Sequence, residues 1–246
     1  MRRLREPGFR AQLLQEKPGK VSGEGSAVPP LVDFFLQNLE FVSARLYRLG
    51  ERPDYEPTPE DSLLMVAERE GRPVMEVIYD ALLEQEGRAL LYFPVFNYTE
   101  MNLDTVHTML THPLALPGLS DGGAHVGTVC DASFPTFLLT HWGRERQRGR
   151  LPVEQLVRMQ AHDTARFLGF TDRGLLAPGQ KADLNVIDWE RLRLLHPEMH
   201  ADLPAGGKRL LQRAEGYRYT LVSGEVIAED GKLTGRRPGR LVRARG

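Results

Sequence analysis

The sequence predicts an α/β fold in which helices and buried strands alternate, followed by a smaller all-β region. Residues 89–96 are almost continuously apolar, which is typical of a parallel strand covered by helices on both faces. Helical periodicity precedes and follows this run, which favours βα units. After Gly169 the pattern changes to short β-rich runs at 184–188, 219–223 and 225–228.

Helices are expected first in the N-terminal third. Residues 17–30 are rich in Gly, Pro and Ser and predict an exposed linker. Apolar residues then recur at helical spacing over 31–49. Thr58 is expected to cap a helix over 58–69, and a further helix is expected over 73–87. A glycine follows or closes each of these three helices.

The middle of the chain continues the alternation. A short amphipathic helix is expected over 103–110, and a second buried strand over 114–119. Two longer helices are expected over 136–148 and 153–167. In the β-rich region, residues 222–226 predict a tight hairpin with glycine in the turn.

Composition excludes several classes of protein. The 246 residues include 32 basic and 33 acidic side chains, giving a formal charge of −1, so no strong field attracts nucleic acid or a membrane surface. Apolar runs stay well below the ~18–20 residues of a membrane span, and no secretory signal is recognisable. The single cysteine, Cys130, allows no intrachain disulfide and fits a reducing compartment. We therefore expect a cytoplasmic protein.

The most informative local feature is the segment that ends in Ser120-Asp121-Gly122-Gly123-Ala124-His125. An acid at the C-terminal end of a barrel strand lies where active sites form, and two glycines let backbone approach a ligand. Asp121 could serve as a metal ligand or a general base, and His125 could orient the substrate or bind a metal ion. The alternative is a simple turn in which Asp121 caps the next segment.

Three weaker candidates have structural alternatives. Cys130 could be a nucleophile, but free cysteines are commonly buried. The pair His196 and His200 has the spacing of zinc ligands on one helix face, although nearby prolines favour an exposed turn. Arg144 could clamp a substrate carboxylate or lie at the solvated end of a helix. The arginine-rich C-terminus lacks interleaved aromatics, which argues against nucleic-acid binding.

Several segments share their pattern with one enzyme family. They are residues 54–57, 96–98, 120–125, 130–136, 141–142, 172–184, 202–207 and 234–241. Together they resemble the C-terminal part of N-acyl-D-amino-acid deacylases, the D-aminoacylase-like branch of the amidohydrolase superfamily.

The resemblance implies a TIM-type barrel and a small β-sandwich. Residues 1–170 would be the last βα units of the barrel, with a helical insertion at 31–87, and residues 171–246 would be part of the sandwich. Family members hydrolyse a linear amide of a small-molecule N-acyl amino acid with zinc-bound water.

The resemblance also assigns roles to individual residues. Asp121 matches the metal-binding carboxylate that takes the proton of the water and passes it to the leaving amine. His125, Asn97 and Tyr98 match substrate-side positions. Independently of the resemblance, Arg144 is the candidate for a substrate carboxylate.

The sequence departs from the family pattern in its metal ligands. The H-x-H pair, the bridging ligand and the further histidines of relatives have no match here, whereas a catalytic zinc needs about three protein ligands. We therefore expect the chain to be incomplete and inactive alone, with a missing N-terminal half or another copy as partner. The alternatives are another amidohydrolase reaction, such as cyclic-amide hydrolysis or deamination, and a non-catalytic remnant or interaction module.

Overall fold

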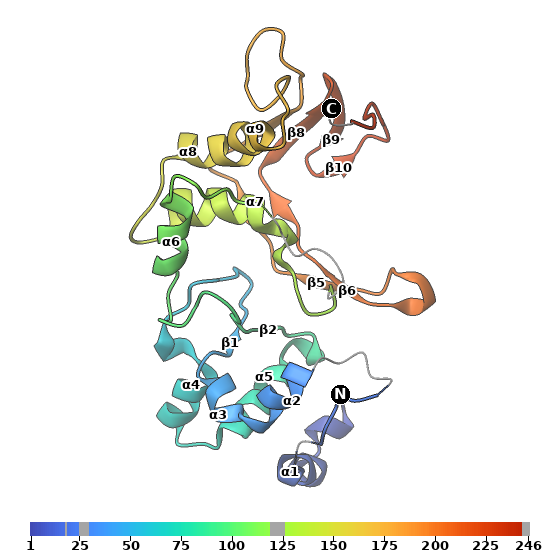
Figure 1. Cartoon of the computed structure of the whole chain (residues 1–246). Helices are drawn as coiled ribbons and strands as arrows, with labels where there is room; N and C mark the ends of the chain where they lie inside the picture. The colour runs from blue at the N-terminus through green and yellow to red at the C-terminus, as the bar shows by residue number, and fades with distance from the viewer. Residues whose placement is uncertain (18, 25–29, 119–125, 243–246) are drawn as a thin grey trace. The chain divides into compact units, whose positions relative to one another are not determined.

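The computed structural model describes residues 1–17, 19–24, 30–118 and 126–242 (Figure 1). The chain divides into two compact units, Met1–Val106 and His107–Gly246, each with its own internal contacts. The predicted division of barrel and sandwich portions at residues 170 and 171 stays a prediction. Among the described residues, no helix combines the length and the apolar character needed to cross a membrane.

Unit 1 is mainly helical, with one short two-stranded sheet (Figure 1). Helix α6 (Asp104–Thr111) follows at the boundary between the units. The elements of unit 1 before α6 are η1 (Arg3–Arg5), α1 (Pro7–Gln15), α2 (Pro30–Gln37), α3 (Leu39–Ser43), β1 (Tyr47–Arg48), η2 (Pro59–Asp61), α4 (Leu63–Glu70), α5 (Val74–Gly87) and β2 (Leu91–Tyr92).

Helices α4 and α5 form the apolar core of unit 1. The hydroxyl of Ser62 caps α4 by accepting from the backbone N–H of Met65 at 3.3 Å, and Gly71 ends the helix in the left-handed conformation at φ 62°. The predicted cap Thr58 instead bonds the side chain of Asp61, because a 3-10 turn precedes the helix. The buried cluster consists of Leu63, Val66, Ala67, Val77, Ile78 and Ala81.

The helix predicted over 31–49 is interrupted and shorter. Asn38 leaves the helical conformation at φ −121° and ψ 54° and separates α2 from α3. The chain then turns, and Tyr47 and Leu49 are buried whereas Arg48 between them is exposed. The apolar residues beyond Ser43 therefore follow the two-residue period of a strand, not the helical period.

The strand predicted over 89–96 forms only at Leu91–Tyr92, and the expected parallel pairing was wrong for it. β2 pairs antiparallel with β1, and both of its residues are only half-buried. Residues 114–118, the described part of the second predicted strand, form no strand, and Leu114 is exposed. All strand pairs among the described residues are antiparallel.

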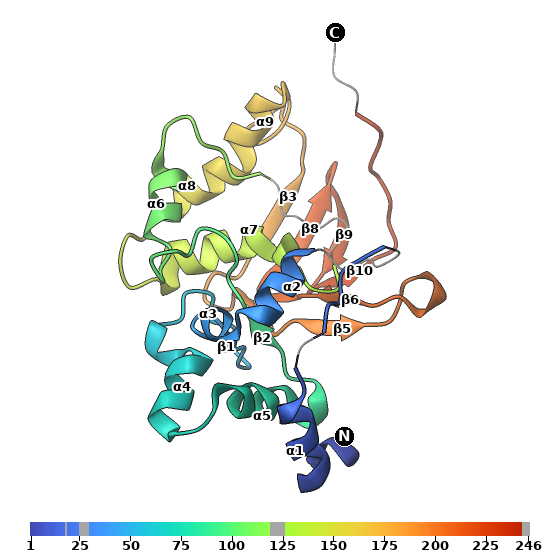
Figure 2. The ribbon, with the colours of Figure 1, turned by 60° about the horizontal axis from the view of Figure 1, so that its bottom comes forward.

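Unit 2 combines two long helical segments with a β-rich C-terminal part, so the mixed fold class and the predicted change after Gly169 are confirmed. α7, η4 and α8, η5, α9 form these segments (Figure 2). The elements are η3 (Asp131–Ser133), α7 (Phe134–Phe137), η4 (Leu138–Glu145), α8 (Val153–Arg158), η5 (Met159–Asp163), α9 (Thr164–Phe167), β3 (Leu184–Ile187), β4 (Arg193–Leu194), β5 (Glu198–His200), η6 (Pro204–Gly206), β6 (Arg209–Leu211), β7 (Ala214–Glu215), β8 (Tyr217–Val222), β9 (Glu225–Glu229) and β10 (Lys232–Leu233).

The main sheet of unit 2 has the order β10-β9-β8-β3. Val222 pairs with Glu225 across the turn between β8 and β9, which confirms the predicted hairpin. Ser223 and Gly224 both adopt positive φ, at 52° and 81°, as a type I′ turn requires.

Candidate functional site

In unit 1, the family-like segment 54–57 contacts β2 and the family-like segment 96–98 through tyrosine side chains. The ring of Tyr55 contacts that of Tyr92 edge-on, with ring centres 5.3 Å apart, and the Tyr92 hydroxyl donates to the Tyr55 carbonyl at 3.3 Å. The hydroxyl of Tyr98 donates to the carbonyl of Pro57 at 2.7 Å. The fold thus brings the turn before α4 to the chain that follows β2.

The two predicted substrate-side residues of this unit have opposite environments. Tyr98 is 2% exposed and its hydroxyl is bonded to Pro57, so it supports the local backbone. Asn97 is exposed and adopts a left-handed conformation at φ 59°, which asparagine tolerates better than most residues. Asn97 is the side chain of this pair that a ligand could reach, and the substrate role of both residues stays a prediction.

Tyr47 packs against Tyr92, with ring centres 6.4 Å apart, and Tyr47, Tyr55, Tyr92 and Tyr98 are the tyrosine cluster of unit 1, whose buried phenols Tyr47 and Tyr98 stay neutral. Burial raises the pKa of Tyr47 to about 12, and burial also raises the pKa of Tyr98 well above its usual value. Glu56 is engaged as well, because its Oε1 accepts from the backbone N–H of Leu103 at 2.8 Å. Tyr92 and Tyr98 thus orient the backbone through the hydrogen bonds that their hydroxyls donate.

Arg144 lies near the end of η4, and its side chain contacts the segment between β3 and β4. Its Nη1 donates to the carbonyl of Trp189 at 2.6 Å, and its Nη2 donates to the carbonyl of Leu192 at 2.5 Å. The guanidinium also lies 5.4 Å from the Trp189 ring centre. These contacts join a helix to the β-rich region, and the predicted substrate role of Arg144 remains a prediction.

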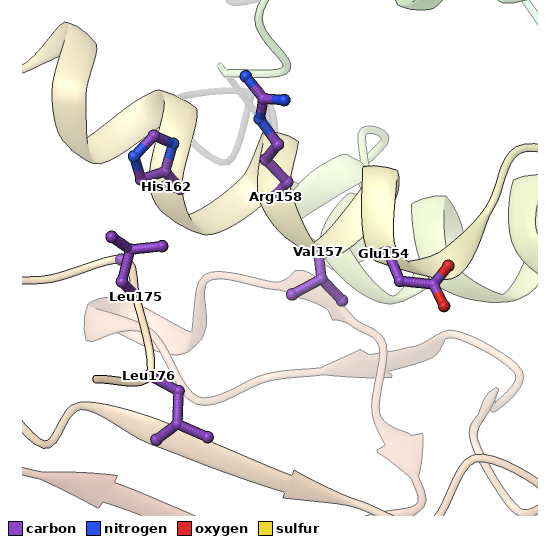
Figure 3. A pocket seen from close by; sticks show the side chains of 7 residues that line it. Glu154, Val157, Arg158, His162, Leu175 and Leu176 are labelled. Carbon is purple, nitrogen blue, oxygen red and sulfur yellow. The ribbon is translucent and has the colours of Figure 1, made fainter. Parts of the chain in front are cut away.

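A pocket of about 480 Å³ lies in unit 2 between the α8–η5 helix and the turn at 174–176, within the size range of small-molecule sites. Val157, Leu175 and Leu176 are the apolar lining residues, and the guanidinium of Arg158 points away from Val157 (Figure 3). The remaining lining residues are Glu154, His162 and Gly174.

The polar edge of this pocket is organised by Asp163. Its Oδ1 lies 2.8 Å from Nδ1 of His162 and accepts from Nε of Arg158 at 3.0 Å. The bond to His162 and the guanidinium of Arg158 hold the pKa of the Asp163 carboxyl below its usual value. Asp163 therefore stays ionised and orients the imidazole, which could bind a polar group of a ligand.

Sequence reasoning missed this pocket. Gly174 has φ 86°, and a Cβ there would lie 2.8 Å from the carbonyl oxygen of Ala161, so only glycine lets the turn approach η5. The π-helical turn of η5 that presents His162 has no sequence signature. The adjacent pair His162-Asp163 was the available signal.

The strongest sequence candidates, Asp121 and His125, lie outside the described residues. The chain directly after them is fixed, because the carbonyl of Val126 accepts from the backbone N–H of Leu210 in β6 at 2.7 Å. A few residues further, the Ser133 hydroxyl bonds Oε1 of Gln212. The roles of Asp121 and His125 stay predictions.

The described residues do not fit a catalytic zinc. They contain no group of three or more His, Cys, Asp or Glu side chains placed to hold a metal ion. The alternative zinc pair is not on a helix face, because His200 ends strand β5 and lies 3.1 Å from Glu198. Burial raises the pKa of the Cys130 thiol, which disfavours the reactive thiolate.

Comparison with protein-family models gives one family. Residues 31–228 match the model of an amidohydrolase family, and the match extends over parts of both units. A comparison with curated proteins finds no significant match.

Solved structures of D-aminoacylase are similar to this chain at 25% sequence identity. One defines a novel subset of amidohydrolases and has a TM-score of 0.41, with 79% of this chain and 37% of that chain covered. A variant in complex with copper chloride has a TM-score of 0.43, with 81% and 38% covered. A third, a study of the binuclear metal centre, has a TM-score of 0.41. The chain thus spans less than two fifths of the length of these proteins.

Proposed function

The chain belongs to the amidohydrolase family, and on this premise we propose that it contributes the C-terminal βα units and part of the β-sandwich of a metal-dependent hydrolase. The bond cleaved is the C–N bond of a linear amide, and the substrate is an N-acyl-D-amino acid. The observation that carries the proposal is the family match over residues 31–228. The family-like segments, from residues 54–57 to 234–241, support the D-aminoacylase-like branch.

The proposed roles of the residues follow from their chemistry and positions. Asp121 is the carboxylate that accepts and returns the proton during amide cleavage. Asn97, whose side chain is exposed, is a substrate-side hydrogen-bonding group, and His125 is a second. Tyr98 fixes the backbone beside Asn97 through Pro57.

The proposed metal is zinc, with Asp121 as one ligand. Because the described residues provide no group of three candidate ligands and the sequence has no H-x-H pair, we propose that the 246-residue chain alone binds zinc weakly and is inactive. The remaining ligands would come from a polypeptide that carries the other part of the barrel.

The first test uses the purified 246-residue chain. Zinc is measured by elemental analysis after dialysis, and turnover is measured on a panel of N-acetyl-D-amino acids with their L enantiomers as controls. We expect substoichiometric zinc and no turnover. Stoichiometric zinc together with deacylation would show that the chain is self-sufficient and contradict its incompleteness.

The second test supplies the missing part by co-expression with a D-aminoacylase segment that encodes the H-x-H pair. We expect turnover of D but not L substrates, reduced about 10²- to 10⁴-fold by Asp121→Asn, the usual contribution of a general acid–base group. Asp230→Asn, in the exposed turn after β9, is the matched control. A folded complex without activity towards any amide would favour a non-catalytic remnant.

A further inference from the structure

Helix α1 lies outside the residues that match the amidohydrolase family, which begin at 31, whereas α5 lies within them. The two helices nevertheless contact each other in unit 1. We define the N-terminal strap as residues 3–15, which comprise η1, Glu6 and α1. The strap thus lies outside the matched residues, and its contacts are with a helix that lies inside them.

The strap makes several polar contacts with α5. Arg10 donates to Glu76 at 3.0 Å and to Asp80 at 3.3 Å, both on α5. Arg5 bonds Glu86 at 2.8 Å, and the carbonyl of Leu4 accepts from a tyrosine hydroxyl of α5 at 2.6 Å. A basic segment thus covers three carboxylates, two of which, Glu76 and Asp80, are also paired with Arg72, just before α5.

Apolar side chains contribute to this attachment through partial burial, at Phe9, Leu13 and Leu14 of α1. None of the residues of α1 is fully buried, unlike α5, whose Val77 and Ala81 are completely buried. An isolated helix of nine residues is marginal in water, so α1 is helical because its side chains are docked on α5. Loss of docking and loss of helical structure in α1 should therefore coincide.

The strap can leave without moving the rest of the unit. Asp33 of α2 accepts from the backbone N–H of Val21 at 2.7 Å and of Ser22 at 3.3 Å. The chain is therefore fixed again at residues 21 and 22, after α1 and before α2. If the strap dissociates, the detached segment therefore ends before residues 21 and 22.

We propose that the acidic surface formed by Glu76 and Asp80 of α5, together with Glu86 in the non-helical turn at its C-terminal end, is an interaction surface for a basic helical peptide, and that the N-terminal strap is its detachable internal occupant. The negative charge of this surface complements a cationic helix, such as the strap itself. Release of the strap frees the surface for such a segment of another protein. The proposal is independent of amide hydrolysis.

The first experiment measures amide hydrogen exchange of the full chain by mass spectrometry, comparing residues 7–15 with residues 74–83. Raising the salt from 0.05 M to 1 M shortens the screening length to about 3 Å. We expect exchange in α1 to accelerate about 3- to 10-fold, since each exposed ion pair shifts the equilibrium only about 1.5- to 5-fold. Arg10→Ala should give a similar acceleration at low salt, and the exposed Arg2→Ala should not.

The second experiment tests the surface itself. A synthetic peptide of residues 1–16 is titrated into the full-length Arg10→Ala chain, whose own strap should open more often than that of the parent chain. We expect salt-sensitive binding that is lost when the peptide also carries Arg10→Ala.

Three results would overturn the proposal. If salt and Arg10→Ala both leave the exchange rate of α1 unchanged, charge does not hold the strap. Equal acceleration in 74–83 would show that α1 is an integral part of the fold, and failure of the peptide to bind would show that α5 is no such surface.

Discussion

The α4–α5 core of unit 1 and the helix–sheet junction of unit 2 are stabilised by different kinds of contact. In the core, side chains such as Leu63 and Val77 are completely buried against other apolar residues. In the junction, Arg144 bonds the carbonyls of two residues in the chain between β3 and β4. Burial in the core follows the helical period of the sequence, whereas the junction adds polar contacts between residues far apart in the chain to the burial of side chains such as Leu192.

The largest effect should come from the core. Leu63→Ala removes a fully buried side chain and should lower the free energy of unfolding of unit 1 by about 2–5 kcal/mol. Met65→Ala, two residues along the same helix but 38% exposed, should cost about 1 kcal/mol or less. Urea-dependent hydrogen exchange of α4 and α5 measures both. Equal losses would mean that burial does not distinguish the two positions.

Substitution in the helix–sheet junction should lower stability less than substitution in the α4–α5 core. Arg144→Ala removes two charge-assisted hydrogen bonds and the stacking on Trp189, which should destabilise unit 2 by about 1.5–3 kcal/mol. Arg144→Lys should restore little, because an ammonium cannot reproduce the planar fork. Both tryptophans, Trp142 and Trp189, lie in unit 2, so their fluorescence during urea unfolding reports this unit.

A variant at Arg144 that is as stable as the parent would contradict this role. The two carbonyls would then contribute nothing to stability, and the arginine would be available for a substrate carboxylate, as the sequence first suggested. Arg150→Ala provides a control with the same loss of charge, since its side chain makes an exposed 3.3 Å contact with the Arg144 carbonyl.

The same contrast explains what could be predicted from the sequence. Gly71 and the hairpin at Ser223-Gly224 were predictable because each signal lies within a few residues of the structure it determines. Strand β1 was not, because its partner β2 lies more than 40 residues later and two residues show no period of their own.

The candidate site shows the same limit. Tyr98 and Asn97 were identified from a motif, but only the fold buries one and exposes the other. The His162–Asp163 pair was adjacent in sequence, yet its pocket depends on the close approach of Gly174 to η5. Long-range packing therefore decides which polar residues a ligand can reach.

High pH should destabilise unit 1 through its buried tyrosines, Tyr47 and Tyr98. The pKa of Tyr47 is raised from 10.0 to about 12 by burial, and that of Tyr98 is raised too, so the folded state favours the neutral phenols. This contribution is complete below pH 10, where the unfolded tyrosines are also neutral, and is lost as the pH rises from 10 through the folded pKa near 12. Unit 1 should therefore lose stability above pH 10, as measured by exchange of α4 and α5 or by ultraviolet titration of tyrosinate. Normal titration of all tyrosines near pH 10 in the folded chain would contradict it.

The smallest expected effect is the difference in stability between the Tyr98→Phe and Tyr47→Phe variants. The Tyr98 hydroxyl donates to Pro57, so Tyr98→Phe should cost about 0.5–1.5 kcal/mol. Among the described residues the buried hydroxyl of Tyr47 has no hydrogen-bond partner, so Tyr47→Phe should be neutral or slightly stabilising, because an unsatisfied polar group is removed at constant shape. Each change deletes one oxygen from a buried ring, so urea unfolding of the two variants isolates the hydrogen bond. A comparable loss for Tyr47→Phe would show that its hydroxyl binds an ordered water, which would make the core of unit 1 partly dependent on polar contacts as well.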